Sequence, residues 1–310
     1  MIIAIKDFEK YISELNKNTV DNPYIIELDL RDKKDFKSLN TILKDNKNEN
    51  KYVHLDISNS IIDEIPNDAF SQVKTLAGIT ITKRITSIGE YAFSGTSLTV
   101  VTIPDKVTSI GKGAFCSCSR LIKISILNGV TRINGFVFDK CINLASISLP
   151  DSVNIIENYS FWNCSNLTNI TIPKNVSIIE DSVFPSCTSL TAINVDSENK
   201  TYSSMDGVLY NKNKTVLFKY PEGKTDYTFT VPNTVIKIWE NAFYHCTNLS
   251  QVIIQEGILT IENNAFLNCS NLIRIIIPNS LTSIGSLAFN RCTSLDFSSL
   301  NIPDNIRIFR

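Results

Sequence analysis

Phenylalanine recurs along this chain about every 23 residues, and this period restricts the possible folds more than any other feature of the sequence. Each of these phenylalanines has an isoleucine five residues before it. They are Phe70, Phe93, Phe115, Phe138, Phe161, Phe184, Phe243, Phe266 and Phe289, with a single interval of 59 residues after Phe184. A fixed period of 20 to 50 residues is typical of solenoids and other repeat architectures.

A strand pattern follows most of the phenylalanines. A leucine six residues later opens the motif Leu-x-x-Ile-x-Ile, as in Leu167, Ile170 and Ile172. Apolar and polar positions alternate at its end, as a half-buried strand requires. A proline often follows and ends the ladder, because it lacks an N–H. Each unit is therefore predicted to be a strand, a turn, a shorter extended piece and a tight turn that carries the phenylalanine.

A single unit of this kind has nothing against which to bury its apolar side chains. Each side chain stabilises the fold by roughly 1.5–3 kcal/mol only when it is fully buried. Stacking solves this problem, because rungs about 4.8 Å apart place each Phe, Ile and Leu on its copy in the next rung. The sequence thus predicts a quasi-one-dimensional repeat solenoid with nine near-complete rungs.

The full repeat reads Leu-x-x-Ile-x-Ile-Pro-x-x-Val-x-x-Ile-Gly-x-x-Ala-Phe-x-x-Cys, and it resembles the BspA-like leucine-rich repeat family over roughly residues 51 to 310. The resemblance implies a right-handed leucine-rich-repeat solenoid, rich in β-structure, with parallel sheets. It also implies a surface or secreted protein that takes part in adhesion to host proteins or other cells. Fold alone does not determine function.

Outside the repeats, the pattern predicts four regions. Residues 1–50 form an αβ N-terminal cap, 51–195 are leucine-rich repeats, 196–230 are a hairpin insert, and 231–310 are leucine-rich repeats with a C-terminal cover. In the cap, Asp7 is the expected N-cap of a first helix, Tyr24 to Leu30 alternate like a strand, and a second helix follows Asp32 or Asp35. Ile306 and Ile308 begin a truncated rung. A separate binding function for residues 1–50 is the alternative to a cap.

The insert combines a hairpin pattern with many aromatic residues. Residues 207–210 and 215–220 are the expected strands, joined by 211–214. Tyr202, Tyr210, Tyr220 and Tyr227 lie among several lysines, a composition that is common at interfaces. These tyrosines either form a protein-binding surface or pack the hairpin onto the rungs.

The cysteines and histidines have a structural explanation. Seven of the eight cysteines stand three residues after a repeat phenylalanine, which predicts small, buried free thiols stacked rung on rung. Disulfides between rungs are the alternative. A zinc site is not expected without Cys-x-x-Cys. His245 beside Cys246 lies in a variable slot, and no catalytic motif is present. We therefore expect no enzyme activity, no cofactor and no metal.

Charge and hydropathy restrict the partners. The 30 basic and 31 acidic side chains give a formal net charge of −1, which disfavours nucleic acid. No apolar run is long enough to span a membrane. Because the chain becomes charged at Lys6, no secretory leader is recognised, and a cytoplasmic location follows if Met1 is the native start. We expect a monomer that binds another protein, at the cell surface or secreted if the resemblance holds.

The candidate contact surface lies on the strands. The slot between the last two strand isoleucines holds polar residues before the insert: Thr80, Thr102, Ser125, Ser148, Thr171 and Asn194. After the insert it holds Ile253 and Ile276, with Gln251 and Arg274 two positions earlier. Exposed isoleucines on a strand face indicate a contact surface, unless the insert folds back and covers them. The polar residues of this slot form a row along the strands, which we call the polar ladder. An intracellular interaction scaffold is one alternative function, and carbohydrate binding by the polar ladder and the Tyr-rich insert is another.

Overall fold

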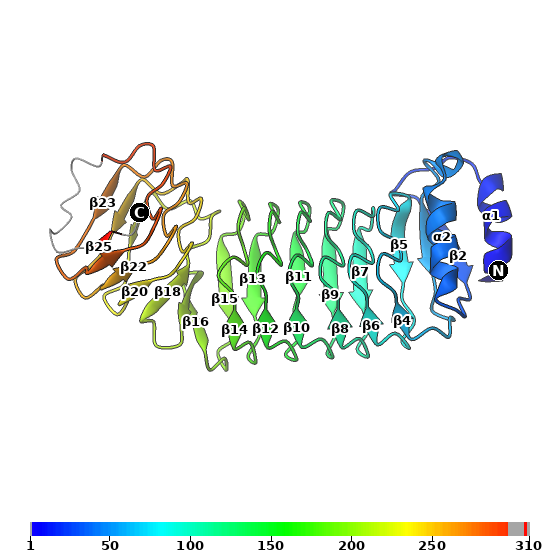
Figure 1. Ribbon diagram of the computed structural model, residues 1–310, viewed down its shortest axis with the longest axis horizontal. Coiled ribbons are helices and arrows are strands. Elements are labelled where there is room, and N and C mark those ends of the chain that lie inside the picture. The colour runs from blue at the N-terminus through cyan, green and yellow to red at the C-terminus, as the bar shows by residue number, and fades with distance from the viewer. Residues whose placement is uncertain (1, 297–306, 309–310) are drawn as a thin grey trace. The chain divides into compact units, whose positions relative to one another are not determined.

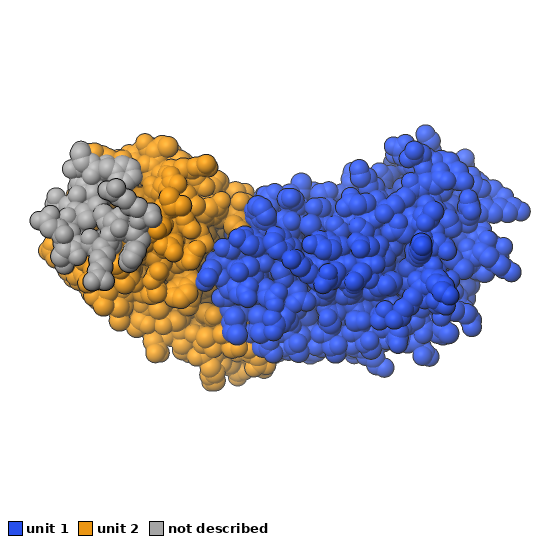
Figure 2. All heavy atoms as spheres, in the orientation of Figure 1, with its two compact units in different colours: residues 1–167, 178–184 blue, residues 168–177, 185–310 orange. Residues whose placement is uncertain are grey.

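The computed structural model describes residues 2–296 and 307–308 and divides the chain into two compact units (Figure 2). Unit 1 comprises residues 1–167 and 178–184, and unit 2 comprises residues 168–177 and 185–310. Each unit is a stack of short parallel strands connected by turns, so the predicted parallel-sheet repeat solenoid is confirmed. Apart from two helices and one 3₁₀ turn near the N-terminus, the described elements are β-strands.

In unit 1 each repeat contributes one long and one short strand, and equivalent residues of successive repeats pair in register. Val101 pairs with Ile124, and Ile88 pairs with Ile110. The long strands are β3 (Val53–Asp56), β5 (Leu76–Thr80), β7 (Val100–Ile103), β9 (Lys123–Ile126) and β11 (Ser146–Ser148) (Figure 1). The short strands are β4 (Glu64–Ile65), β6 (Ser87–Ile88), β8 (Ser109–Ile110), β10 (Arg132–Ile133), β12 (Ile155–Ile156) and β14 (Ile178–Ile179).

The repeat phenylalanines form the centre of each core. From Phe70 to Phe184 in unit 1, successive rings stack with centroids 5.2–5.9 Å apart. In unit 2, Phe243 stacks on Phe266 at 4.6 Å. Most of these rings have no exposed surface. The core is therefore a continuous aromatic column in each unit, flanked by columns of isoleucine and leucine.

The turns that carry the phenylalanines use left-handed backbone at non-glycine residues. Phe136 and Lys140, two positions before and after Phe138, have φ of 61° and 57°. The same pair of positions is left-handed around Phe161 and Phe266. Each such residue costs roughly 1–2 kcal/mol in local conformation. Stacking offsets this cost, because the turn amides bond across rungs, as when the Phe138 N–H donates to the Ser160 carbonyl at 2.8 Å.

All eight cysteines are free thiols, as the repeat slot predicts, and all but Cys116 are buried. Several donate their S–H to the carbonyl of the phenylalanine in the preceding rung, as Cys118 does to Phe93 O at 3.0 Å and Cys269 to Phe243 O at 3.0 Å. Burial raises the pKa of Cys118 to about 12. The row of stacked cysteines therefore stabilises the fold by hydrogen bonds as well as by packing.

The N-terminal cap has the predicted αβ composition. Helix α1 (Ile5–Glu14), strand β2 (Tyr24–Leu28), helix α2 (Lys34–Lys44), the 3₁₀ turn η1 (Asn46–Asn48) and strand β1 (Ile2–Ile3) make up this region. The sheet order β1-β2-β3-β5 joins the cap directly to the first repeats. Phe36 of α2 packs edge-on against Phe70 at 5.5 Å, which covers the first ring of the column.

One detail of the predicted cap is wrong. Asp7 is not the N-cap of α1, because Ala4 occupies that position and Asp7 lies in the first turn. An acidic residue there still favours the helix through its dipole. For α2 the N-cap position is Lys33, one residue after Asp32, whose carboxylate accepts the Lys34 N–H at 2.9 Å.

The insert contains the predicted hairpin and a third strand. Strands β17 (Val208–Asn211) and β18 (Val216–Lys219) pair antiparallel, and β16 (Tyr202–Met205) pairs antiparallel with β17. The second half of the insert then continues the solenoid. Strand β18 pairs in parallel with β20 (Lys237–Ile238), and β19 (Thr228–Thr230) pairs with β21 (Gln251–Ile253). Tyr220 takes the place of the repeat phenylalanine and stacks on Phe243 at 5.4 Å.

The remaining strands of unit 2 complete its sheets. They are β13 (Asn169–Ile172), β15 (Ala192–Val195), β22 (Thr260–Ile261), β23 (Arg274–Ile276), β24 (Ser283–Ile284) and β25 (Arg307–Ile308). Strand β25 pairs in parallel with β24, so the chain continues the short-strand sheet at Ile308. Ile306, the other residue of the predicted truncated rung, lies outside the described residues.

Candidate protein-binding surface

Strands β19, β21 and β23 of unit 2 form a sheet with one face toward the core and one toward solvent. The row that packs toward the core consists of Phe229, Val252 and Ile275. Because neighbouring residues of a strand point to opposite faces, the flanking rows face solvent. One outward row is Thr228, Gln251 and Arg274, and the other is Thr230, Ile253 and Ile276.

A third row lies just before these strands, and its two large side chains, Tyr227 and Ile273, are exposed. It consists of Tyr227, Ser250 and Ile273, joined by backbone bonds from Ser250 N to Tyr227 O at 2.9 Å and from Ile273 N to Ser250 O at 2.8 Å. Tyr227 is 76% exposed, Ile273 59% and Ile276 37%. We refer to Tyr227, Gln251, Ile253, Ile273, Arg274 and Ile276 as the unit 2 strand face.

The unit 2 strand face holds large apolar groups on a regular backbone. Continuous parallel pairing fixes the spacing of the rows, and further bonds such as Ile254 N to Ile276 O at 3.1 Å extend the ladder. Arg274 is exposed among these apolar side chains. An exposed apolar patch of this kind marks contact surfaces more often than an isolated apolar residue does.

Three of the four predicted surface tyrosines are buried instead. Tyr202, Tyr210 and Tyr220 are exposed by 5%, 0% and 1%, so the reading of these three as a binding surface is wrong. They pack the insert onto the rungs: Tyr220 belongs to the aromatic column, and Tyr202 lies edge-on to Phe218 at 5.4 Å. Only Tyr227 of the four is exposed.

The insert extends the strand face and does not fold over it. Thr230 of β19 pairs with Ile253, which pairs in turn with Ile276. Ile253 is therefore half-buried between two neighbouring strands, while Ile276 is exposed. Ile273 belongs to the same surface but was not among the predicted residues. Its slot, one position after the repeat leucine, holds Ala77, Thr99 and Ala145 but also Ile122, so an isoleucine in this slot does not by itself mark the surface in the sequence.

The earlier strands carry the polar ladder in the same slot. In unit 1, Thr80, Thr102 and Ser148 are exposed, and Ser125 is half-buried. In unit 2, Thr171 pairs with Asn194, and both are exposed. Sugars are often recognised by aromatic faces beside hydroxyl groups, but the insert tyrosines that this would need are in the core, apart from Tyr227. The ladder alone is an uncharged strand surface.

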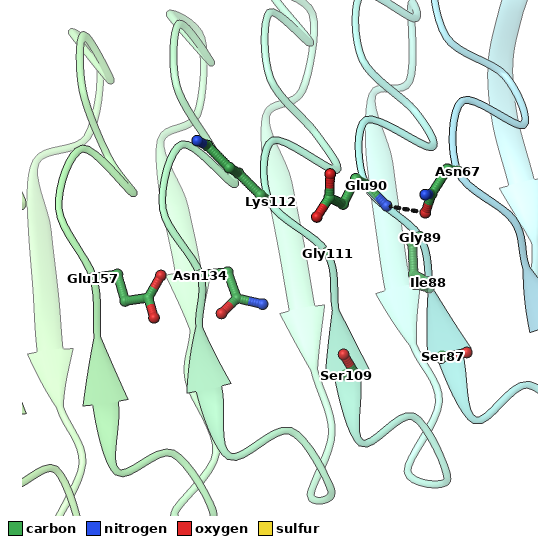
Figure 3. Close-up of a pocket in the computed structure, with 10 residues that line it drawn as sticks. All are labelled: Asn67, Ser87, Ile88, Gly89, Glu90, Ser109, Gly111, Lys112, Asn134 and Glu157. Carbon is green, nitrogen blue, oxygen red and sulfur yellow. Dashed lines mark hydrogen bonds between the residues drawn. The ribbon is translucent and has the colours of Figure 1, made fainter.

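A shallow hollow of about 390 Å³ lies beside the short strands of unit 1 (Figure 3). It exists because Gly89 and Gly111 have no side chain where the next two rungs carry Asn134 and Glu157. Three of its polar side chains bond across the rungs: Asn67 Oδ1 accepts the Glu90 N–H at 2.8 Å, Asn134 donates to Ile110 O, and Glu157 accepts the Gly135 N–H. These bonds hold the rungs together, so the hollow is a consequence of the repeat.

Among residues 2–296 and 307–308, no group of three or more His, Cys, Asp and Glu side chains is arranged to hold a metal ion. Within the same described residues, no helix is long and apolar enough to cross a membrane.

Stacked units that each begin with a leucine-led strand, together with an outward strand face of variable residues, define a leucine-rich-repeat protein. The chain belongs to the BspA-type leucine-rich repeat family, as the resemblance indicated. The model described as "BspA type Leucine rich repeat region" matches in six copies over residues 41–139, 109–227 and 217–310. No curated protein matches the chain.

Solved structures of other leucine-rich-repeat proteins are similar to this one. The pneumococcal vaccine antigen PcpA is 26% identical over 86% of this chain, with a TM-score of 0.62. A leucine-rich cell surface protein from Faecalibacterium prausnitzii is 28% identical over 88% of this chain, which spans 82% of that protein, with a TM-score of 0.61. A leucine-rich-repeat protein from Eubacterium ventriosum is 31% identical over 79%, with a TM-score of 0.54. The chain spans 60% of PcpA and 58% of the Eubacterium protein.

Proposed function

We propose that this protein is a non-enzymatic recognition module that binds another protein through the unit 2 strand face. The observation that carries the proposal is the exposure of Tyr227, Ile273 and Ile276 on the first and third of three successive rungs of a hydrogen-bonded sheet. Interfaces of this kind have an apolar centre, with Tyr and Arg enriched. Arg274, exposed within the patch, adds a charge that a partner with an acidic group would complement.

A rigid surface favours this use. The strand face needs little ordering on binding, because its backbone is fixed by the parallel ladders on both sides of β21. Low ordering cost leaves more of the contact energy for affinity. The same slots elsewhere in the repeats hold mostly threonine, serine, alanine or asparagine, with Ile122 of unit 1 as an exception, and of these repeats only one carries isoleucine at both slots, Ile273 and Ile276.

Replacing Ile273 and Ile276 together by aspartate is expected to weaken binding of the protein partner by at least about tenfold, since hot-spot side chains each contribute about 2 kcal/mol or more. The partner is first captured by cross-linking to the wild-type chain, and its affinity for each purified variant is then measured by surface plasmon resonance.

The matched control is Ile122→Asp with Ser125→Asp. These residues occupy the same two slots of a repeat in unit 1, and Ile122 is 51% exposed. The control variant should bind like the wild type. Equal loss in both variants would show that a strand face of unit 2 has no special role, and unchanged binding in the Ile273/Ile276 variant would remove this surface from the proposal.

For the location, we propose that the protein acts outside the cell, in adhesion or contact with host proteins. The support is by similarity, because one related structure is of a cell surface protein and another is of a vaccine antigen. The second candidate function is an intracellular interaction scaffold. The observation that favours it is the presence of eight free thiols, which persist more readily in a reducing compartment.

Treatment of intact source cells with a protease is expected to degrade this protein while a cytosolic marker stays intact. Immunoblotting of the treated cells, before and after lysis, makes the measurement. Protection until lysis would contradict the surface location and leave the intracellular scaffold as the function.

A further inference from the structure

A buried carboxylate fastens the end of the insert to the solenoid in unit 2. Glu222 lies in the loop between β18 and β19, and its side chain is 1% exposed. Its Oε1 atom accepts the Ser186 N–H at 3.1 Å and lies 3.4 Å from the Lys219 ammonium. The neighbouring Gly223 N–H donates to the Leu190 carbonyl at 2.8 Å. The loop therefore bridges the repeat before the insert and the first rung after it.

The second oxygen of this carboxylate is different. Glu222 Oε2 is buried and has no hydrogen-bond partner among the described residues. The polar group that faces it is the His245 ring, whose Nδ1 atom is 3.9 Å away. The His245 side chain is 40% exposed, so solvent protons reach the ring. A buried carboxylate oxygen without a donor is costly, and a small rotation of His245 would supply the missing donor.

The other charged and titratable groups around this carboxylate do not complete its second oxygen. Lys219 Nζ points to Oε1 and to the carbonyls of Asn241 and Tyr244, each at 3.4 Å. The Cys246 thiol is buried beside the cluster, and burial raises its pKa to about 12, so it stays neutral. Farther along the loop, Asp226 accepts the Tyr220 hydroxyl at 2.8 Å and pairs with Lys224. His245 is thus the group placed to donate to Oε2.

We propose that His245 and Glu222 form a pH-responsive clasp, in which a protonated His245 binds Glu222 Oε2 and fastens the 221–223 loop more tightly at acidic than at alkaline pH. Imidazole is the side chain that changes charge most readily between pH 5 and 8. The clasp holds the segment that leads directly into β19 and Tyr227. It stands independently of whether the strand face binds a protein.

The pKa of the Glu222 carboxyl also makes this site more stable at acidic than at alkaline pH. Burial, the largest cause, raises the pKa of the Glu222 carboxyl, while Lys219 and His245 oppose that rise. A raised carboxyl pKa means that folding is favoured when the group is protonated and disfavoured as pH rises through the raised value. Through this carboxyl, lowering the pH therefore favours the folded state.

The test measures the midpoint of thermal unfolding by circular dichroism at pH 8.0 and pH 5.5 for the wild type, His245→Gln, Glu222→Gln and the double variant. Glutamine suits this turn because Gln72 occupies the same repeat slot with the same φ of 60°. His245→Gln should lower the midpoint by about 2–4 °C more at pH 5.5 than at pH 8.0. In the Glu222→Gln background this extra loss should disappear.

His54→Gln is the control, since His54 is the other of the two histidines in the chain. Burial lowers the pKa of His54, so its neutral form is favoured in the fold and acid weakens that site. This control should therefore change the pH response in the opposite sense to His245→Gln. Parallel behaviour of wild type and His245→Gln at the two pH values would overturn the clasp, as would persistence of the His245 effect without the Glu222 carboxylate.

Discussion

Replacing Phe138 by alanine is expected to lower the free energy of unfolding by about 3–5 kcal/mol, the usual cost of removing a large aromatic side chain from a core. The Phe138 ring is fully buried between Phe115 at 5.9 Å and Phe161 at 5.4 Å. Its loss leaves a void in the middle of a column, where the backbone is fixed on both sides by parallel pairing and collapses little. Urea unfolding followed by circular dichroism gives the measurement.

Phe136→Ala supplies the comparison two residues earlier in the same turn. Its ring is half-buried at the surface and stacks on Tyr159 at 5.1 Å. Alanine adopts the left-handed conformation at this position no more easily than phenylalanine does, so the loss is limited to the surface contacts of the ring with Tyr159 and with the Lys112 ammonium, 5.2 Å from its centroid, at about 0.5–1.5 kcal/mol. If the two variants lost equal stability, the buried column would not be the centre of the core.

The Phe138 column could be predicted because the sequence repeats it with an almost constant period. A side chain that recurs every 22 or 23 residues must meet its copies once the units stack, whatever the detailed turn geometry. The same reasoning placed the cysteines in a buried slot, which the structure confirms for the seven in register. The period does not show that the turn residues two positions before and after the phenylalanine adopt positive φ. Residues as large as Phe136 and Lys140 occupy these positions, and their residue type does not indicate a left-handed backbone.

The rung inside the insert could not be recognised because its spacing is different. Leu217 pairs with Ile238 and Tyr220 stacks on Phe243, so they fill the isoleucine and phenylalanine positions of a repeat. They are three residues apart, whereas the other repeats separate the two positions by five. With a different residue type at both positions and a shorter turn, neither the identity nor the period of the pattern remained. The hairpin was therefore the part of the insert that the sequence pattern could predict.

The candidate surface was predicted in part for the same reason. Ile253 and Ile276 depart from a slot that is otherwise polar, and a departure from a repeat is readable in the sequence. The tyrosines of the insert lie outside the repeats, so they could not be compared with equivalent residues of other rungs. A large aromatic side chain serves equally well in a core or at an interface, and composition does not separate the two. Burial of Tyr202 and Tyr210 against the rungs depends on tertiary packing that only the structure shows.

Gly111→Ala is expected to destabilise the protein by about 3 kcal/mol, at the upper end of the usual cost of overpacking. A Cβ atom at Gly111 would lie 2.4 Å from the backbone nitrogen of Glu90 and 2.5 Å from the carbonyl carbon of Gly89. Both are backbone atoms of the preceding rung, which cannot move without breaking the bond from Gly111 N to Ile88 O at 2.7 Å. Urea unfolding of the purified variant makes the measurement.

Gly135→Ala separates this close approach from a general intolerance of added side chains in the turns. The nearest atom to a Cβ at Gly135 is the Asn158 carbonyl oxygen at 3.2 Å, a tight contact that a shift of a few tenths of an ångström relieves. That variant should lose less than about 1 kcal/mol, in the lower range of overpacking costs. Equal losses would mean that the rungs are not held at contact distance by glycine. A much larger loss at Gly111 would show that the absence of a side chain at this position is what allows the turn to approach the backbone of the preceding rung so closely.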